Sequence, residues 1–302
     1  MSRGPFFAML LGMLAVATAP PLILLAGVPP FALAAWRLMA VGMILLPFCT
    51  GALLRDLKQL TAREHAWLWA SGILYGLHFG LFNLAFEHTS KESVVVLLGA
   101  QPLMAAAVGA IWLKEAITRV MVGASALAIC GLLIFVWHDY TFDAAHLVGD
   151  GLVLVCGLAI VLSYSIGRRL RPRMSLVGYL GGLYWIGGLT CLTIALVAGD
   201  TLWGYADDSW FWLGCAVILP TLVGHSLFHY VVKYVPVFYV NLTILGEPIL
   251  ALLLMYLLRE RYLEFQQSSL SLLQLVGGSM LLVGVGIGLT AWRKPKVEEA
   301  LT

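Results

Sequence analysis

The sequence predicts an all-α integral membrane protein with ten transmembrane helices, and two observations support this. Of its 302 residues, 61% are hydrophobic and only 11% are charged, whereas soluble domains are roughly 45 to 50% apolar and about 25% charged. Apolar runs long enough to cross a membrane, which takes about 20 residues each, recur along the whole chain. These runs do not alternate and are too long for barrel strands, so a helical bundle is predicted rather than a β-barrel.

The ten predicted spans lie near residues 6–27, 31–50, 65–87, 92–113, 118–137, 147–168, 176–198, 210–233, 236–258 and 270–292. The first run is too long for a signal-peptide core and is followed by no small-residue cleavage site, so it is expected to be retained as a span. The five cysteines fall in or at the edge of spans without CxxC spacing. Neither a disulfide framework, a metal site nor a cofactor is therefore expected.

The distribution of charge predicts the orientation of the chain. Most of the 18 Lys and Arg residues fall on one side, in clusters such as "RRLRPR" and "RKPK", while the loops at 138–146 and 199–209 carry acids and no Lys or Arg. The positive-inside rule then places both termini, including a tail at 293–302, in the cytoplasm of a multi-pass protein of the inner or plasma membrane. The basic clusters are interpreted as orientation signals, so the expected surroundings are lipid and no nucleic-acid partner is expected.

An internal repeat is visible at a constant offset. The stretch "FNLAFEHTSKESVVVLLGAQPLMAAAVGAIWLKE" aligns with "FHYVVKYVPVFYVNLTILGEPILALLLMYLLRER", so that Gln101 lies over Glu247 and Pro102 over Pro248. Because five helices per half is an odd number, the second half crosses the membrane in the opposite sense, which is the inverted-repeat architecture of many secondary transporters. A chance match between two apolar strings is the alternative.

These residues also carry a family resemblance. The stretches "GHSLFHYVVKYVPVFYVNLTILGEPILALLL", "VGDGLVLVCGLAIVLSYSIGRRLRPRMS" and "ATAPPLILLAGVPPFALAAWRLMAVGMILL" resemble the EamA branch of the drug/metabolite transporter superfamily. The resemblance implies two inverted EamA repeats, at 1–137 and 147–292, around a cavity lined mainly by helices 1, 3, 4, 6, 8 and 9. It also implies transport of small metabolites, often amino-acid export. The sequence departs from the family pattern in two places. Helix 1 lacks the Trp-Gly often seen there, and the stretch after helix 9, "RERYLEFQQSSLSLLQ", is longer than the usual loop.

Glu247 is an acid inside the apolar run "NLTILGEPILALLLMYLL". Pro248 has no amide hydrogen, so the carbonyl of Ile244 loses its partner and the helix is expected to kink or break, opening a polar patch near the middle of the membrane. Pro102 is expected to act in the same way, which makes the two prolines candidate gating positions. Glu247 itself could be a packing residue, a contact for a cationic group of the substrate, or the site of a driving proton.

Two further residues bear on the charge of the site. Gln101, the counterpart of Glu247, can hydrogen-bond but cannot titrate, so the predicted site is electrically one-sided. Arg37 is the only basic residue well within a predicted span. The favoured interpretation is that it snorkels to the outer headgroups. In the alternative it pairs with an acid or with a substrate carboxylate, and an amino acid would then have an anchor for each end.

His225 and His229 are four residues apart and share one face of the eighth span. Their HxxxH spacing suits a metal, but no carboxylate or cysteine follows at a matching interval. Hydrogen bonding in a cavity, proton relay and simple packing remain open for them. The other candidate substrate-binding residues are polar or aromatic side chains on neighbouring spans, namely His78, Tyr75, Asn83, Tyr164 and Trp185.

The sequence contains no enzyme motif such as GxxxxGK[ST], HExxH or GxSxG, so an enzyme is not expected. The predicted function is secondary-active export of amino acids or related metabolites by alternating access, either proton-coupled or by facilitated exchange, by a monomer or a homodimer. Transport of organic cations or other metabolites, and a membrane scaffold or sensor that binds without transporting, are the alternatives.

Overall fold

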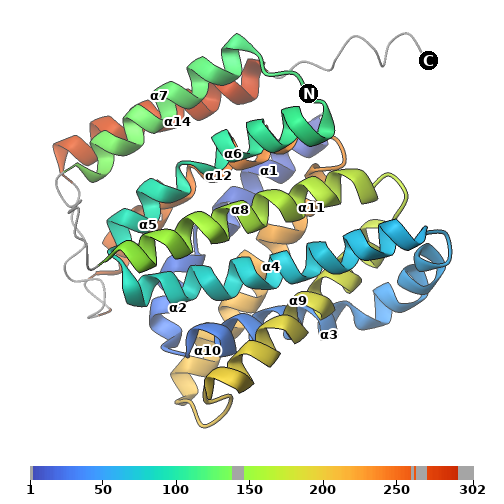
Figure 1. Ribbon diagram of the computed structural model, residues 1–302. Coiled ribbons are helices and arrows are strands. Elements are labelled where there is room, and N and C mark those ends of the chain that lie inside the picture. The colour runs from blue at the N-terminus through green and yellow to red at the C-terminus, as the bar shows by residue number, and fades with distance from the viewer. Residues whose placement is uncertain (1–2, 138–145, 260–261, 263–270, 292–302) are drawn as a thin grey trace.

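The computed structural model describes residues 3–137, 146–259, 262 and 271–291, and every regular element in this part of the chain is helical. The helices run side by side in an elongated bundle (Figure 1). Eight segments are long and apolar enough to cross a membrane: Gly4–Ala26, Pro30–Leu57, Ala62–His88, Leu147–Leu170, Leu176–Ala198, Asp207–Val231, Val237–Leu258 and Leu272–Thr290. Two shorter apolar helices, Gln101–Leu113 and Arg119–Phe135, occupy the predicted fourth and fifth spans. The predicted all-α membrane fold is confirmed.

Several spans are built from more than one helical piece. The first half contains α1 (Arg3–Val16), α2 (Ala19–Ala26), α3 (Pro30–Leu57), α4 (Ala62–His88), α5 (Lys91–Leu98), α6 (Gln101–Val108), the π-helical η1 (Gly109–Leu113) and α7 (Arg119–Val136). The second contains α8 (Leu147–Leu170), α9 (Leu176–Ala198), α10 (Asp207–Ala216), the π-helical η3 (Val217–His225), α11 (Ser226–Val231), α12 (Val237–Ile244), α13 (Glu247–Leu258) and α14 (Leu272–Ala291). The interruptions within spans matter for the site described below.

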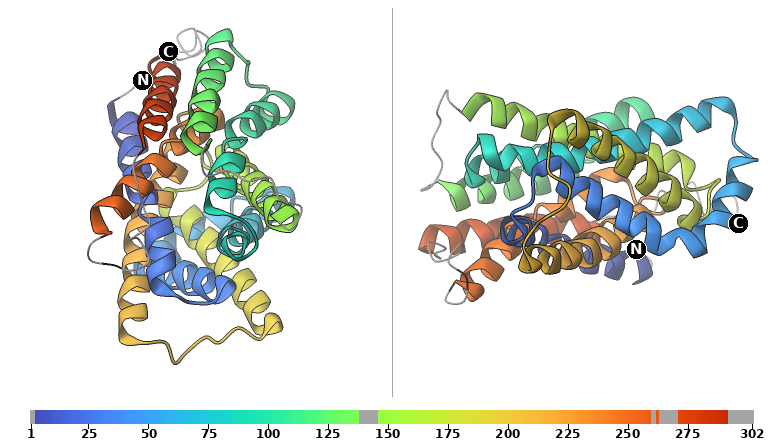
Figure 2. Two further views of the ribbon diagram at one scale, coloured as in Figure 1. Left: turned by 90° about the vertical axis from the view of Figure 1, so that its left-hand side faces the viewer. Right: turned by 90° about the horizontal axis from the view of Figure 1, so that it is seen from below.

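The two halves are interleaved rather than set side by side as separate bodies. α3 packs against α9, and α4 packs against both α8 and α9, so each of these contacts joins the first half to the second. α7 packs along α14 at one edge of the bundle, in Figure 1 and in the left view of Figure 2. The interior of the bundle is therefore shared between the two repeats.

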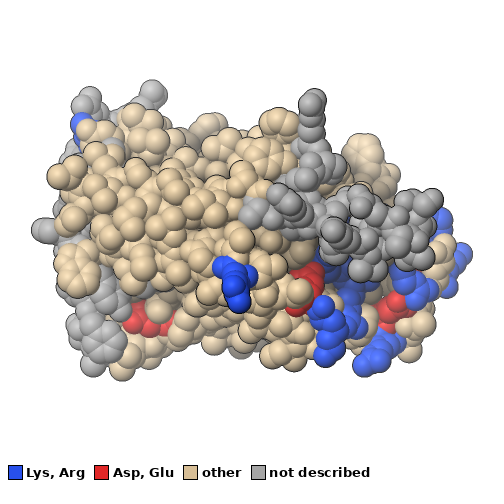
Figure 3. Space-filling view, turned by 90° about the horizontal axis from the view of Figure 1, so that it is seen from above, with Lys and Arg blue, Asp and Glu red and all other residues tan. Residues whose placement is uncertain are grey.

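Most of the Lys and Arg side chains visible in Figure 3 gather toward one end of the bundle, on the right of the view. One end, called the basic end from here on, holds Arg55, Lys58, Arg63, Lys114, Arg119, Arg168, Arg169, Arg171, Arg173 and Lys233. The opposite end, called the acidic end, holds Asp150, Asp200, Asp207 and Asp208. Between the ends the exposed surface is rich in large apolar side chains such as Phe48 and Val155, which are 69% and 56% exposed. This pattern suits a protein whose middle contacts lipid.

Polar contacts join the two halves at both ends. At the basic end, Arg168 Nε donates to Glu115 Oε1 at 3.0 Å, and its Nη1 donates to the backbone carbonyls of Val232 and Lys233 at 3.1 and 3.0 Å. At the acidic end, Trp36 Nε1 donates to the carbonyl of Leu202 at 2.9 Å. Trp36–Leu202 and Arg168–Glu115 thus join the two repeats near opposite ends of the bundle.

Glycine lets α7 and α14 approach closely. A Cβ atom added to Gly131 would lie 2.6 Å from the carbonyl oxygen of Gly277, and one added to Gly277 would lie 2.5 Å from that of Gly131. In a membrane, such close approach of small residues is a main source of helix association, because lipid chains are as apolar as the side chains themselves.

We expect Gly131→Ala to destabilise the protein by about 1 to 3 kcal/mol, because the added methyl group forces the two backbones apart. Gly123→Ala on the same helix is the matched control, since nothing lies within 4 Å of its added Cβ, and Ala is the better helix former by about 1 kcal/mol. Thermal unfolding in detergent should give a lower Tm for the first variant only. Equal Tm values for the two would show that the α7–α14 contact does not depend on Gly131.

Arg168 and Glu115 form an ion pair at the basic end, and we expect the stability of the protein to respond unequally to the loss of each partner. Burial raises the pKa of the Glu115 carboxyl despite the nearby Arg168. Ionisation of Glu115 is therefore less favourable in the folded than in the unfolded protein. The contribution of Glu115 to the free energy of unfolding consequently falls as pH rises through the pKa of the folded state. Glu115→Gln should therefore change stability by less than about 0.5 kcal/mol. Arg168→Met should cost about 2 to 3 kcal/mol, because it leaves Glu115 and two carbonyls without a donor. Similar losses of Tm in detergent would contradict this account.

Candidate functional site

Two spans are interrupted at matching positions of the repeat. α5 ends at Leu98 and α6 begins at Gln101, while α12 ends at Ile244 and α13 begins at Glu247. Each new helix carries proline in its first turn, where the missing N–H has no intrahelical partner to lose. Each interruption therefore presents a helix N-terminus, which is the positive end of the helix dipole, together with one polar side chain.

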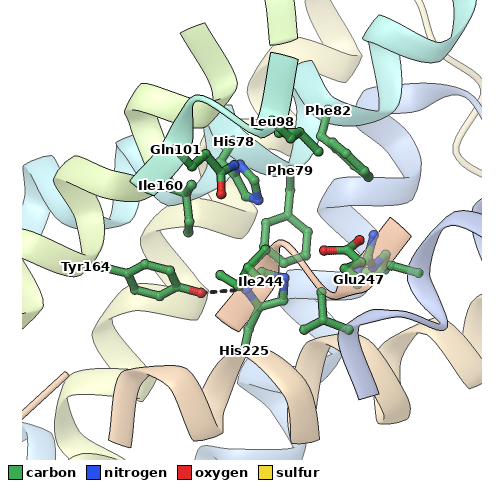
Figure 4. A pocket seen from close by; sticks show the side chains of 13 residues that line it. His78, Phe79, Phe82, Leu98, Gln101, Ile160, Tyr164, His225, Ile244 and Glu247 are labelled. Atoms are coloured by element: carbon green, nitrogen blue, oxygen red, sulfur yellow. Dashed lines mark hydrogen bonds between the residues drawn. The ribbon is translucent and has the colours of Figure 1, made fainter. Parts of the chain in front are cut away.

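A small cavity lies where these interruptions meet the neighbouring helices (Figure 4). Its lining residues come from both repeats: Val16, Ala19, Arg37, His78, Phe79, Phe82, Leu98, Gln101, Ile160, Tyr164, His225, Ile244 and Glu247. The cavity has a volume of about 40 Å³ for water-sized occupants, which is room for on the order of three waters. In this conformation it is too small for a metabolite, so a larger occupant requires the walls to move apart.

Arg37 is held inside the bundle by α3. Its side chain is only 2% exposed, its Nε donates to Thr221 Oγ1 at 3.0 Å, and its guanidinium carbon lies 4.6 Å from the ring centroid of Phe79. The interpretation that Arg37 snorkels to the headgroups is therefore wrong. Its side chain is directed to the cavity because α3 packs against α9 and η3 on that face.

The partner of Arg37 is placed by an irregular helix. Pro220 has no N–H, so the carbonyl of Ala216 cannot accept the usual bond from that position. Thr221 Oγ1 donates to this carbonyl instead, at 2.7 Å, and η3 continues with π-helical geometry to His225. π-Helical segments are uncommon and are often found at functional sites. One missing amide hydrogen thus positions both the hydroxyl that meets Arg37 and the imidazole of His225.

Glu247 is 8% exposed and lines the same cavity as Arg37. No described residue donates a hydrogen bond to its carboxylate or forms an ion pair with it. Its position in the first turn of α13 places it at the favourable end of that helix dipole. Arg37 and Glu247, a base and an acid, therefore face one cavity without a direct bond to each other.

Apart from Arg37 and Glu247, the polar side chains that line the cavity form hydrogen bonds or pack against neighbouring helices. Tyr164 Oη and His225 Nδ1 are 3.2 Å apart (Figure 4), and His78 Nδ1 lies 3.0 Å from the carbonyl oxygen of Cys156. Gln101 is 3% exposed and packs beside Gly157 of α8. These groups can donate and accept hydrogen bonds, so the cavity offers polar contacts as well as one basic and one acidic side chain.

Other candidates from the sequence lie outside the cavity. Asn83 Nδ2 donates to the carbonyl of Pro30 at 2.9 Å, close to the start of α3. Trp185 packs beside Gly42 between α9 and α3. Tyr75 and His229 are fully buried behind the cavity wall, toward the basic end. Neither ring nitrogen of His229 has a hydrogen-bond partner, and an unsatisfied buried polar atom of this kind costs about 1 to 3 kcal/mol.

Sequence reasoning did not identify Thr221 or the apolar wall. Pro220 next to Thr221 in an apolar run was the available signal, because proline frees a carbonyl that a neighbouring hydroxyl can occupy. The apolar lining residues, among them Phe79, Leu98 and Ile160, carry no such signal. Their side chains are of the types that also face lipid along the outside of the bundle.

Comparison with known proteins agrees with this architecture. Residues 3–137 and 147–289 each match the EamA-like transporter family, and the chain belongs to that family; it is a multi-pass membrane transporter. An uncharacterized transporter of Archaeoglobus fulgidus is 26% identical over 263 residues, which cover 85% of each chain. A protein of known crystal structure superposes with a TM-score of 0.77 over 95% of this chain and 96% of its own, at 16% identity, and so shows the fold alone.

The contact between Thr221 and Arg37 can be measured by a double-mutant cycle. Thr221→Val removes the only acceptor that a described residue offers to Arg37 Nε, and the loss of a hydrogen bond to a charged group costs about 1.5 to 3 kcal/mol. With Arg37→Met in place, Thr221→Val should cost less, so the two losses should not add. Thr243→Val is the control, because Thr243 is equally buried and bonds its own helix through Tyr239. Additive losses of Tm for Thr221 and Arg37 would show that the two side chains do not interact.

Proposed function

We propose that the protein is a secondary-active carrier that exports amino acids or closely related zwitterionic metabolites by alternating access. The observation that supports this is a base and an acid in one cavity: Arg37 and Glu247 both line it, both are buried, and neither forms an ion pair with a described residue. Membership of the transporter family supports the general class of function. The choice of substrate rests on the charges.

A zwitterion is the ligand that best matches this charge pair. A buried charge is unfavourable unless it is paired and hydrogen-bonded. An α-amino acid offers a carboxylate to Arg37 and an ammonium group to Glu247, and it adds no net charge to the membrane interior. An organic cation would bring a like charge toward Arg37, and an organic anion would bring one toward Glu247. The substrate side chain would meet an apolar wall that includes Phe82, Leu98 and Ile244, which favours neutral amino acids.

Alternating access requires the two repeats to move about this cavity. We assign the repeats to 1–137 and 147–292, with the basic end and both termini in the cytoplasm of an inner or plasma membrane protein. Pro102 and Pro248 are the proposed gating positions, because the helix interruptions beside them have fewer intrahelical bonds to break. Either exchange or proton coupling is compatible with this arrangement. In the coupled version, a proton and the substrate ammonium group compete for Glu247.

The proposal is tested by counterflow of labelled leucine in proteoliposomes, with competing unlabelled analogues. Leucine keeps both charges, isoamylamine lacks the carboxylate, and isocaproate lacks the ammonium group. Competition by leucine alone supports a zwitterion carrier. Stronger competition by isoamylamine would support an organic cation carrier instead, and the absence of counterflow for a full amino-acid panel by folded protein would support a scaffold or sensor.

Glu247→Gln should lower apparent affinity for leucine at least about tenfold while the protein remains folded, because the ammonium group loses its charged partner. Glu87→Gln is the control, since Glu87 is exposed near the end of α4. The same assay with an imposed pH gradient separates the two mechanisms. If Glu247 carries the driving proton, wild-type counterflow responds to the gradient and the variant does not. Wild-type affinity in Glu247→Gln would remove Glu247 from the site.

A further inference from the structure

A second group of polar side chains is enclosed by the bundle behind the wall of the cavity. It comprises Ser71 and Tyr75 of α4, Ser163 of α8, Tyr179 of α9 and His229 of α11, and is called the inner cluster below. Each of these residues is 0% exposed. None of them lines the cavity itself.

The inner cluster lies between the cavity and the basic end. α4 begins at the basic end, so Ser71 and Tyr75 are nearer to that end than the cavity residue His78. α11 runs toward the same end, so His229 lies one helical turn beyond the cavity residue His225. Any substrate that passes between the cavity and the basic end along these helices meets the inner cluster.

Two members of the inner cluster have unpaired polar atoms. The hydroxyls of Ser71, Ser163 and Tyr179 are satisfied, since Ser71 Oγ lies 2.7 Å from Tyr179 Oη and 3.0 Å from Ser163 Oγ. Neither nitrogen of His229 has a partner, and the hydroxyl of Tyr75 has none either. A phenyl group at position 229 would leave no polar atom unsatisfied, so the unpaired imidazole calls for an explanation other than packing.

The surroundings of His229 favour a negatively charged group. Arg171, which is 3% exposed, donates from Nε to the backbone carbonyl of His229 at 3.4 Å and also donates to the carbonyl of Met174. The inner cluster contains no carboxylate, whereas tyrosine, serine and imidazole groups can all donate hydrogen bonds. A carboxylate would meet the two donors that have no partner, the Tyr75 hydroxyl and the His229 imidazole, whose ring centroids are 5.2 Å apart, with the Arg171 guanidinium nearby.

We propose that the inner cluster is a second substrate subsite, in which His229 hydrogen-bonds the carboxylate of the substrate during its passage between the cavity and the basic end. The proposal rests on the zwitterion transport proposed above. Tyr164 separates the two sites: its hydroxyl lies 3.2 Å from His225 Nδ1, and its ring centroid lies 4.9 Å from that of His229. Rotation of Tyr164 away from His225 joins the cavity to the inner subsite.

The test compares binding with transport in His229→Phe. Equilibrium binding of labelled leucine to detergent-solubilised protein should stay within about twofold of wild type, because the cavity is intact. Counterflow in proteoliposomes should slow at least about tenfold, since the substrate loses a hydrogen bond to its charged group during passage. The Tm should be unchanged or higher by about 2 °C, because two unsatisfied nitrogens are removed. His88→Phe, at an exposed position of α4, is the control and should transport normally.

The outcomes separate the inner subsite from the carrier function itself. If wild-type protein shows counterflow and His229→Phe matches its rate, the inner subsite is overturned while the carrier proposal stands. If His229→Phe slows counterflow only because binding is lost in equal measure, His229 belongs to the cavity site and the separate subsite is overturned. If folded wild type shows no counterflow of any zwitterion, the proposed function fails, and the subsite that rests on it fails with it.

A second variant keeps the test informative if His229→Phe does not fold. His229→Cys is prepared with the five native cysteines replaced by alanine or serine and is treated with methanethiosulfonate reagents carrying either a sulfonate or a trimethylammonium group. During leucine counterflow, the sulfonate reagent should modify Cys at this position at least about fivefold faster than at rest, and faster than the cationic reagent. Equal rates at rest and during counterflow, or a preference for the cationic reagent, would overturn the subsite.

Discussion

Inside a hydrocarbon layer every backbone N–H and carbonyl needs a partner within the protein, and this requirement determines where the bundle can be irregular. The described chain departs from α-helical bonding within spans next to Thr18, Gln101, Thr221 and Glu247, which surround or adjoin the cavity. A further π-helical segment, η1, lies away from the cavity and carries the exposed side chain of Ile111. Most of the irregular backbone is thereby gathered around a small interior volume that also holds polar side chains.

The inverted repeat distributes charge unevenly around that volume. Glu247 corresponds to Gln101 in the other half, and at the same offset Arg37 corresponds to Leu183, a residue that is 0% exposed in α9. Each repeat thus contributes one charged side chain to the cavity, with opposite signs and without a charged counterpart. The two repeats therefore match in their helices but differ in the ionisable side chain that each contributes to the cavity.

The sequence was sufficient for the helices and for the matching breaks, because apolar length and proline chemistry are local properties. Gln101 and Glu247 could be paired from the repeat alone. Arg37 could not be placed in the same way, because counting 1.5 Å per residue gives depth along a helix but not the face on which a side chain lies. That face is set by the packing of α3 against α9 and η3, which the sequence does not encode locally.

The same limit explains the other differences. Asn83 and Trp185 are polar or aromatic residues at suitable depths, but the helices that carry them are apolar on nearly every side, so the sequence does not show which face turns inward. The π-helical geometry of η3 changes the angle between successive side chains, so a regular spacing of 100° per residue does not describe that span. Thr221 and the cavity face of His225 follow from this change.

The unequal lengths of the helices have a consequence for the surrounding lipid. α3 has 28 residues and α7 has 18, which correspond to lengths of about 42 Å and 27 Å, while the hydrocarbon core of a bilayer is about 30 Å thick. α3 is therefore long enough to reach the headgroup region at the basic end, where Arg55 and Asp56 lie in its last turn, whereas α7 fits only if it stands nearly upright or if the leaflets thin beside it. The edge of the bundle that carries α7 is thus shorter than the hydrocarbon core, a hydrophobic mismatch that is absent at α3. A change in the thickness of the host membrane therefore affects these two parts of the bundle unequally.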